Sequence, residues 1–120
     1  MFEAKIDLVR NSLTIRYWSR VEPGEVKRFT EQLPGLLLDL HPGFSLLTDM
    51  SDLESMDLEC VPHLKTVMNL CNEKKVGMVV RVIPDPRKDI GLNILSLFHY
   101  DRGVRFVTCK TLDEGRRFLE

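Results

Sequence analysis

The chain has 120 residues, 43% of them hydrophobic and 29% charged, and a formal net charge of −1. This length predicts a single domain over residues 1–120 with one core, and the composition excludes a disordered or low-complexity chain. Basic and acidic residues are interspersed, so the broad basic face typical of nucleic-acid-binding proteins is missing, and we expect no nucleic-acid partner.

Signals for membrane insertion or secretion are also missing from the sequence. The longest apolar run is only a few residues long, whereas a membrane-spanning helix needs about 20, and the first residues lack the layout of a signal peptide. Cys60, Cys71 and Cys109 form no Cys-x-x-Cys pair, so neither a disulfide framework nor a zinc site is indicated. We therefore expect a cytoplasmic protein with reduced, mostly buried cysteines.

The first part of the chain alternates between apolar and polar residues. Residues 4–10 and 12–18 follow this pattern, which predicts two antiparallel strands joined by a tight hairpin. A helix is expected to start at residues 21–25, because Pro and acidic residues are favoured in a first turn, and its apolar stripe continues to Leu40. Pro34-Gly35 interrupts the stripe and predicts either a kink or two short consecutive helices.

The middle of the chain combines a short apolar strand with a long helical pattern. Residues 44–50 predict a mostly buried strand, and residues 51–54 have capping-box spacing that predicts the start of a single turn. A long helix is expected to begin near Asp57, with apolar residues in one continuous stripe. The β-branched run at residues 76–83 is typical of a strand covered on both faces, and we expect it to be the central strand.

The last part repeats the alternation of helix and strand. Residues 87–99 have helical spacing, residues 104–109 predict a strand, and residues 111–114 form a second capping-box pattern. That pattern opens a short terminal helix with Phe118 and Leu119 expected to point inward. The predicted order is ββαβαβαβα, an α/β fold with a mixed, mostly parallel sheet flanked by helices.

Asp49 and Asp57 stand eight residues apart, at the end of the buried strand and near the start of the long helix. In these features and in its element order the sequence resembles the STAS family, the fold of bacterial anti-sigma-factor antagonists and of sulfate-transporter domains. The family has Asp-Ser-Ser-Gly at the helix start, whereas this chain has Asp57-Leu58-Glu59-Cys60. The resemblance implies that Glu59 replaces the regulatory phosphoserine and that phosphorylation cannot switch this position. Residues 98–119 are more similar to a divergent STAS-like branch that is compared with lipid-transfer domains.

The stretch from the buried strand to the long helix is the first candidate site. Ligands commonly bind beyond the carboxyl ends of strands in α/β sheets. Plain helix capping is the alternative role for the two serines and Asp57. A phosphate cradle is disfavoured, because the turn has no glycine and several carboxylates. Glu59 is instead a fixed, partial mimic of a phosphoserine in our hypothesis. The predicted partner-binding residues are Asp49, Ser51, Ser55, Asp57 and Glu59.

The histidines and cysteines do not form a recognisable catalytic or metal site. His41, His63 and His99 lack metal-ligand spacing. Cys60 or Cys71 is formally able to pair with His63 as a nucleophile, but no third orienting group is indicated. We therefore expect a protein that is not an enzyme and that has no cofactor.

The second candidate site is the predicted helix at residues 87–99. Leu92 and Leu95 lie off the main apolar stripe, which includes Phe98, so the helix is apolar on more than one side. A second stripe predicts either a homodimer interface or the mouth of an apolar pocket, and isolated exposed leucines remain a third interpretation.

Two functional hypotheses follow from these sites. The first is a non-catalytic regulatory module that docks to a protein partner, or to itself, through the turn at residues 51–60. The alternative is a small carrier or sensor that binds an apolar, lipid-like ligand under the helix at residues 87–99. Leucines that point into a cavity favour the carrier, and leucines on a flat surface favour assembly.

Overall fold

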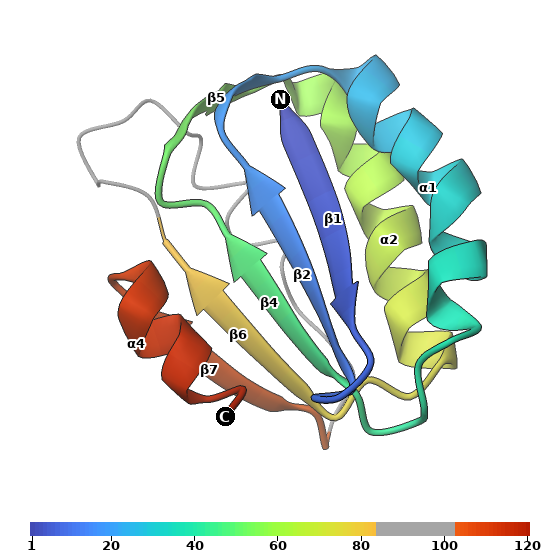
Figure 1. Cartoon of the computed structure of the whole chain (residues 1–120). Helices are drawn as coiled ribbons and strands as arrows, with labels where there is room; N and C mark the ends of the chain where they lie inside the picture. Colours follow the sequence, from blue (N-terminus) through green and yellow to red (C-terminus); the bar gives the residue numbers. More distant parts are fainter. Residues whose placement is uncertain (84–102) are drawn as a thin grey trace.

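The computed structural model describes residues 1–83 and 103–120. A hairpin opens the chain and a short helix ends it (Figure 1). In chain order the elements are β1 (Phe2–Asp7), β2 (Ser12–Tyr17), β3 (Ser19–Val21), α1 (Pro23–Leu37), β4 (Ser45–Asp49), β5 (Leu53–Met56), η1 (Leu58–Cys60), α2 (Val61–Glu73), β6 (Met78–Val82), β7 (Arg105–Cys109) and α4 (Leu112–Arg117).

Among the described residues, the main sheet has five strands in the order β1-β2-β4-β6-β7. The β1–β2 pair is antiparallel and the other neighbours are parallel, as predicted for a mixed, mostly parallel sheet. The middle position belongs to β4, so the prediction that residues 76–83 form the central strand is wrong. An apolar run indicates a strand that is paired on both sides and covered on both faces, as β6 is. Any interior strand has this pattern, so the run does not identify the middle strand.

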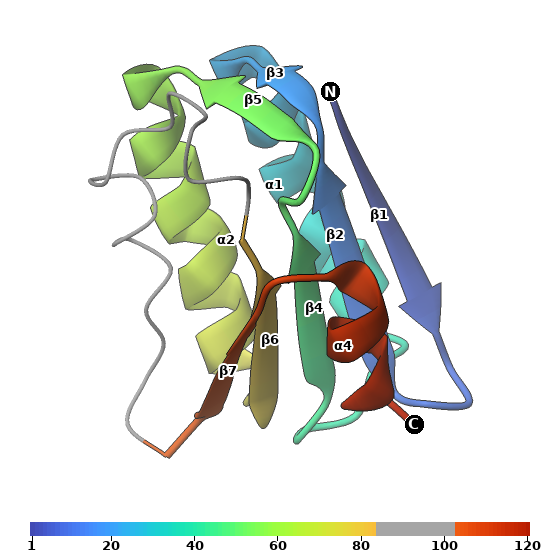
Figure 2. The same ribbon diagram turned by 90° about the vertical axis from the view of Figure 1, so that its left-hand side faces the viewer.

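Helices cover both faces of this sheet. Figures 1 and 2 show α1 and α2 side by side on one face and α4 on the other. The larger core cluster lies under α1 and α2, and a smaller cluster lies under α4. Leu46 and Leu47 of β4 are 0% and 1% exposed and belong to these two different clusters. Successive side chains of a strand point to opposite faces, so β4 is buried on both sides.

A second, smaller sheet consists of β3 and β5, which pair in parallel. The turn expected at residues 51–54 is present at its start, where the N–H of Leu53 donates to the carbonyl of Met50 at 3.1 Å. The capping box does not form, since Leu53 begins β5. The backbone N–H of Ser19 donates to the carbonyl of Asp52 at the start of this pairing, with an N–O distance of 3.0 Å. The strand forms because β3 supplies backbone partners that the local sequence does not reveal.

Two further predictions about helices need correction. Pro34 lies inside α1, which runs unbroken from Pro23 to Leu37, so the alternative of two short helices is wrong. The buried stripe formed by Phe29, Leu33 and Leu37 holds the last turns against the core and offsets the loss of one backbone hydrogen bond at the proline. Phe118 was expected to point inward but is 39% exposed, because α4 ends at Arg117.

Several local predictions are confirmed. The three cysteines are free and buried. The side chain of Thr111 caps α4 by accepting a hydrogen bond from the backbone N–H of Glu114, with an oxygen–nitrogen distance of 3.2 Å. The expected helix at residues 87–99 lies outside the described residues. Among the helices of the described ranges, none combines the length and hydropathy that a bilayer crossing requires.

Gly77 lies where two backbone segments pass close to each other. Its N–H donates to the carbonyl of Phe44 at 2.8 Å, and the N–H of Gly43 donates to the carbonyl of Lys75 at 2.7 Å. A Cβ atom at position 77 would lie 2.7 Å from the carbonyl oxygen of Gly43, whereas one at Gly35 would meet nothing within 4 Å. Only the first site therefore requires glycine for space.

We predict that Gly77→Ala lowers the free energy of unfolding by about 1–3 kcal/mol, because the backbone must move to relieve the overlap. The matched substitution Gly35→Ala, in the exposed part of α1, is expected to raise it by up to about 1 kcal/mol. Urea denaturation followed by circular dichroism measures both changes. Equal changes in unfolding free energy for the two variants would contradict the conclusion that only Gly77 requires glycine for space.

Candidate functional site

Asp49 is the last residue of β4 and is only 2% exposed. Its Oδ1 atom accepts hydrogen bonds from the backbone N–H of Ser51 at 3.0 Å and from the Ser51 hydroxyl at 2.6 Å. This is an Asx-type turn, in which the carboxylate organises the chain two residues further on. Ser51 therefore serves as a donor to Asp49 and does not cap a helix.

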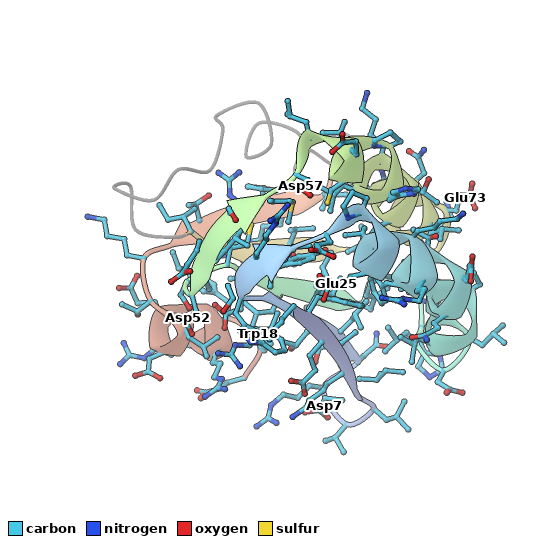
Figure 3. All side chains as sticks on the ribbon, turned by 90° about the horizontal axis from the view of Figure 1, so that it is seen from above. Asp7, Trp18, Glu25, Asp52, Asp57 and Glu73 are labelled. Atoms are coloured by element: carbon cyan, nitrogen blue, oxygen red, sulfur yellow. The ribbon has the colours of Figure 1, made fainter. Side chains whose placement is uncertain are left out.

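Arg16 on β2 connects Asp49 to the neighbouring loop. It lies opposite Asp49 in the sheet register, and its Nε atom is 3.9 Å from Asp49 Oδ2. Its Nη2 atom donates to Asp52 Oδ2 at 3.0 Å, and its guanidinium carbon lies 4.7 Å from the centre of the Trp18 ring. Figure 3 shows Trp18 and Asp52 on the same side of the molecule. The cluster thus links the ends of two main strands to the loop that leads into β5.

Asp57 lies at the other end of β5 and has a separate partner. The Nη2 atom of Arg20 is 3.2 Å from both carboxylate oxygens of Asp57, and this carboxylate raises the pKa of Arg20. Asp57 is the N-cap residue of η1, but its side chain makes no capping hydrogen bond. The structure therefore divides the predicted single turn into two clusters, one at Asp49 and one at Asp57, with β5 between them.

The remaining predicted residues lie on or beside β5. Ser55 is half-buried and stands opposite Arg20 in the β3–β5 register. Glu59 is exposed on η1, immediately before α2. Leu58, which no sequence pattern singled out, is 66% exposed next to Glu59. The sequence feature that could have indicated this residue is its position between two acidic residues at the start of a helix. We call Leu58 and Glu59 the η1 surface, because both are exposed on η1.

A groove on the α4 face of the sheet adjoins the Asp49 cluster. It consists of two neighbouring cavities of about 260 and 710 Å³, which share Lys5, Thr14 and Arg116 as lining residues. The smaller cavity includes Asp49 and Ser51. Three acidic and three basic side chains line it, so its charge favours neither an anion nor a cation. Its residues come from four distant parts of the chain, and no sequence pattern predicted it.

The cysteine chemistry argues against a thiolate nucleophile. Burial, reinforced by the charge of Asp57, raises the pKa of Cys60 from its usual value of 9.0 to about 11. Burial also raises the pKa of Cys71 to about 12. Both thiols are therefore protonated at neutral pH, where a nucleophilic cysteine needs its thiolate form. Within the described ranges, no group of three or more His, Cys, Asp or Glu side chains converges as metal ligands.

Leu92, Leu95 and Phe98, the second candidate site, lie outside the described residues. Their assignment to an interface or a pocket stays a prediction.

The architecture matches solved structures over almost the whole chain. The anti-sigma factor antagonist SpoIIAA in its unphosphorylated form aligns with a TM-score of 0.67 at 12% identity, covering 98% of this chain and 96% of that one. The fold is STAS-like. An uncharacterised protein of the DUF3478 family from Shewanella loihica, described as having a SpoIIAA-like fold, aligns with a TM-score of 0.69 at 13% identity, covering 99% of this chain and 94% of that one. Neither a scan of protein-family models nor a search of curated proteins finds a match to the sequence.

The η1 surface lies between β4 and α2, in the stretch of chain that carried the sequence resemblance. Asp49 ends the buried strand β4, and Glu59 precedes α2, as expected from the spacing. At this level of identity the likeness establishes the fold alone, and the chemistry of the junction comes from the contacts described above.

We predict that Asp49→Ala lowers the free energy of unfolding by about 1–3 kcal/mol, because both donors of the partly buried Ser51 lose their acceptor. The control Asp52→Ala removes a carboxylate whose side chain is 65% exposed, and a change below about 1 kcal/mol is expected there. Urea denaturation at neutral pH compares the two variants. A larger effect at Asp52 would show that the surface ion pair, rather than the buried turn, stabilises the junction.

The raised thiol pKa values predict a loss of stability in alkali. In the unfolded chain these thiols ionise near pH 9, whereas the folded chain keeps its protons to about pH 11 at Cys60 and pH 12 at Cys71. The unfolded state therefore binds fewer protons in this range, and the free energy of unfolding falls as the pH rises from 9 to 11.

Denaturation of Cys71→Ala under reducing conditions tests this prediction. The slope of unfolding free energy against pH is expected to become shallower by up to about 1.4 kcal/mol per pH unit. Val67→Ala, which removes an equally buried but uncharged side chain of α2, is the control and is expected to keep the wild-type slope. Identical slopes for the wild type, Cys71→Ala and Val67→Ala would contradict the raised pKa of Cys71.

Proposed function

We propose that this protein is a non-catalytic regulatory module of the cytoplasm that docks to a protein partner through the η1 surface. The observation that carries the proposal is the exposure of Leu58, which is 66% accessible next to the exposed residue Glu59. An exposed leucine alone is common. Here it lies beside a fixed charge at the helix start, where the sequence resembles the regulated segment of the STAS family.

The η1 surface is rigidly supported from below. Met56 and Cys60, on either side of it, are 7% and 0% exposed, and the Cys60 thiol lies 3.6 Å from the carbonyl oxygen of Val21 as a hydrogen-bond donor. The Arg20–Asp57 ion pair holds the same segment to β3. Side chains presented by anchored backbone lose little entropy on binding. This arrangement supports a preformed docking surface.

Glu59 gives this surface a permanent negative charge. A phosphoserine carries a charge of about −1.5 to −2 near neutral pH, so one carboxylate supplies roughly half of it. The family pattern implies that the matching serine is regulated by phosphorylation. Glu59 in place of this serine supports a module whose docking surface is always in one charge state. Docking would then depend on the amounts of this protein and its partner.

The comparison with SpoIIAA supports this proposal at the level of architecture. SpoIIAA is an anti-sigma factor antagonist, and a STAS-like fold in a chain whose buried thiols are protonated is consistent with a binding rather than a catalytic role. The alternative of a lipid-like carrier depends on Leu92, Leu95 and Phe98, and no contact of the described residues favours it.

Site-specific photo-crosslinking in the native cells tests the docking surface. We expect a photoreactive amino acid at position 58 to give one discrete adduct with another protein. The same amino acid at position 38 replaces a leucine that is 79% exposed on a different part of the surface, and no such adduct is expected there. Glu59→Lys in the position-58 protein is expected to remove the adduct. Equal adducts from both positions, or none from position 58, would contradict the proposal.

The partner identified in this way then allows a test of Glu59 itself. Glu59→Ser is expected to weaken binding about fivefold or more, the equivalent of about 1 kcal/mol, whereas Glu59→Asp retains most of the affinity. Unchanged affinity of the serine variant would leave docking in place but exclude a phosphoserine-like role for Glu59.

A further inference from the structure

Within residues 1–83 and 103–120, β1 is the outer strand of the main sheet and pairs only with β2. Figure 2 shows its free side at the margin of the sheet, with no described element beyond it. Edge strands present unpaired backbone N–H and C=O groups to other chains, and proteins usually guard them with charged side chains. β1 carries such charges, at Glu3, Lys5 and Asp7.

The hydrogen-bond pattern defines which residues face the free edge. The N–H of Trp18 donates to the carbonyl of Met1 at 3.0 Å, and the antiparallel register pairs Glu3 with Arg16 and Lys5 with Thr14. Hydrogen-bonded and non-hydrogen-bonded pairs alternate in an antiparallel ladder, so the odd-numbered residues of β1 bond to β2. The backbone groups of Phe2, Ala4 and Ile6 therefore point outward.

The side chains of β1 also divide by parity. Phe2, Ala4 and Ile6 pack against the larger core cluster. Glu3 and Lys5 lie on the opposite face and form an ion pair, with 3.1 Å between Glu3 Oε1 and Lys5 Nζ. Any strand that extends the sheet at this edge must match the outward backbone groups and meet this row of alternating charges.

A second copy of β1 meets both requirements in one antiparallel register. With Ala4 opposite Ala4 of the other copy, Phe2 stands opposite Ile6 and each pair exchanges backbone hydrogen bonds. Glu3 of each copy then stands opposite Lys5 of the other, in the closely spaced non-hydrogen-bonded positions. A shift by one pairing step in one direction places Glu3 opposite Glu3. A shift in the other direction places Lys5 opposite Lys5. Both shifts bring like charges together.

We propose that two copies of this chain associate through the free edge of β1, in the antiparallel register centred on Ala4, and form one continuous sheet across the dimer. The interface is isologous, since the same strand contributes on both sides of a two-fold axis. The alternating charges guard the edge against shifted registers and stabilise this one. The inference is independent of the η1 surface, because it uses none of its residues.

Analytical ultracentrifugation of the full chain tests the proposal. The wild-type protein is expected to shift, with rising concentration, from its chain mass of 13.9 kDa to twice that mass. Lys5→Glu and Glu3→Lys each create like-charge pairs at both symmetry-related positions, and each is expected to raise the dimer dissociation constant at least about tenfold. The double variant with both substitutions restores opposite charges and is expected to recover dimerisation to within about threefold of wild type.

Ala4→Pro gives a second test that is independent of charge. It removes an N–H that is not used in the β1–β2 ladder, so the monomer keeps its fold while the edge loses a central donor, and the variant is expected to remain monomeric. Ala4→Ser keeps the N–H and is the matched control. Circular dichroism confirms folding of every variant. A wild-type protein that stays monomeric up to about 0.5 mM, which excludes even a weak dimer with a dissociation constant below that concentration, would overturn the proposal. So would a dimer that survives Ala4→Pro, or a double charge variant that stays monomeric.

Discussion

The burial of β4 on both faces is the constraint on which the other elements depend. Leu46 and Leu47 are adjacent, point in opposite directions and are both removed from solvent. A strand with two apolar faces is stable only between two covering layers. The helices α1 and α2 supply one layer and α4 supplies the other (Figure 2). Where this strand ends, the carboxylate of Asp49 turns the chain out of the sheet toward β5.

Most of the fold was predictable from local patterns. The hairpin, the buried strand, α2 and the capped α4 each depend on neighbouring residues, and the bond between Thr111 and Glu114 confirms one such pattern directly. The predictions failed where a distant partner decides the outcome. Residues 51–54 fit a helical turn as well as a strand, and only the pairing of β5 with β3 decides between them. The strand order likewise depends on contacts between elements, which no local pattern contains.

The candidate site was predictable in its residues but not in its arrangement. Asp49 and Asp57 were expected to share one turn. The strand β5 separates them, and four residues of strand extend over about 13 Å at 3.3 Å per residue. Their partners, Arg16 and Arg20, come from the segment around β2 and β3 and stand more than thirty positions earlier in the chain. No spacing rule connects residues so far apart. Leu58 was missed for another reason, because the exposure of an apolar side chain depends on the finished surface.

The strand order has a consequence for how the chain assembles. Only β1 and β2 are joined by a short turn, whereas the pairs β2–β4 and β4–β6 each require a helix-length connection to close first. Contacts between distant residues form slowly because the loop entropy is lost before the contact stabilises the chain. The β1–β2 hairpin needs no such connection, so it is expected to form early. The outer strand β1 is thus paired with β2 before the core forms. The free edge of β2 is then available for β4, the first strand of the parallel part of the sheet, to pair with.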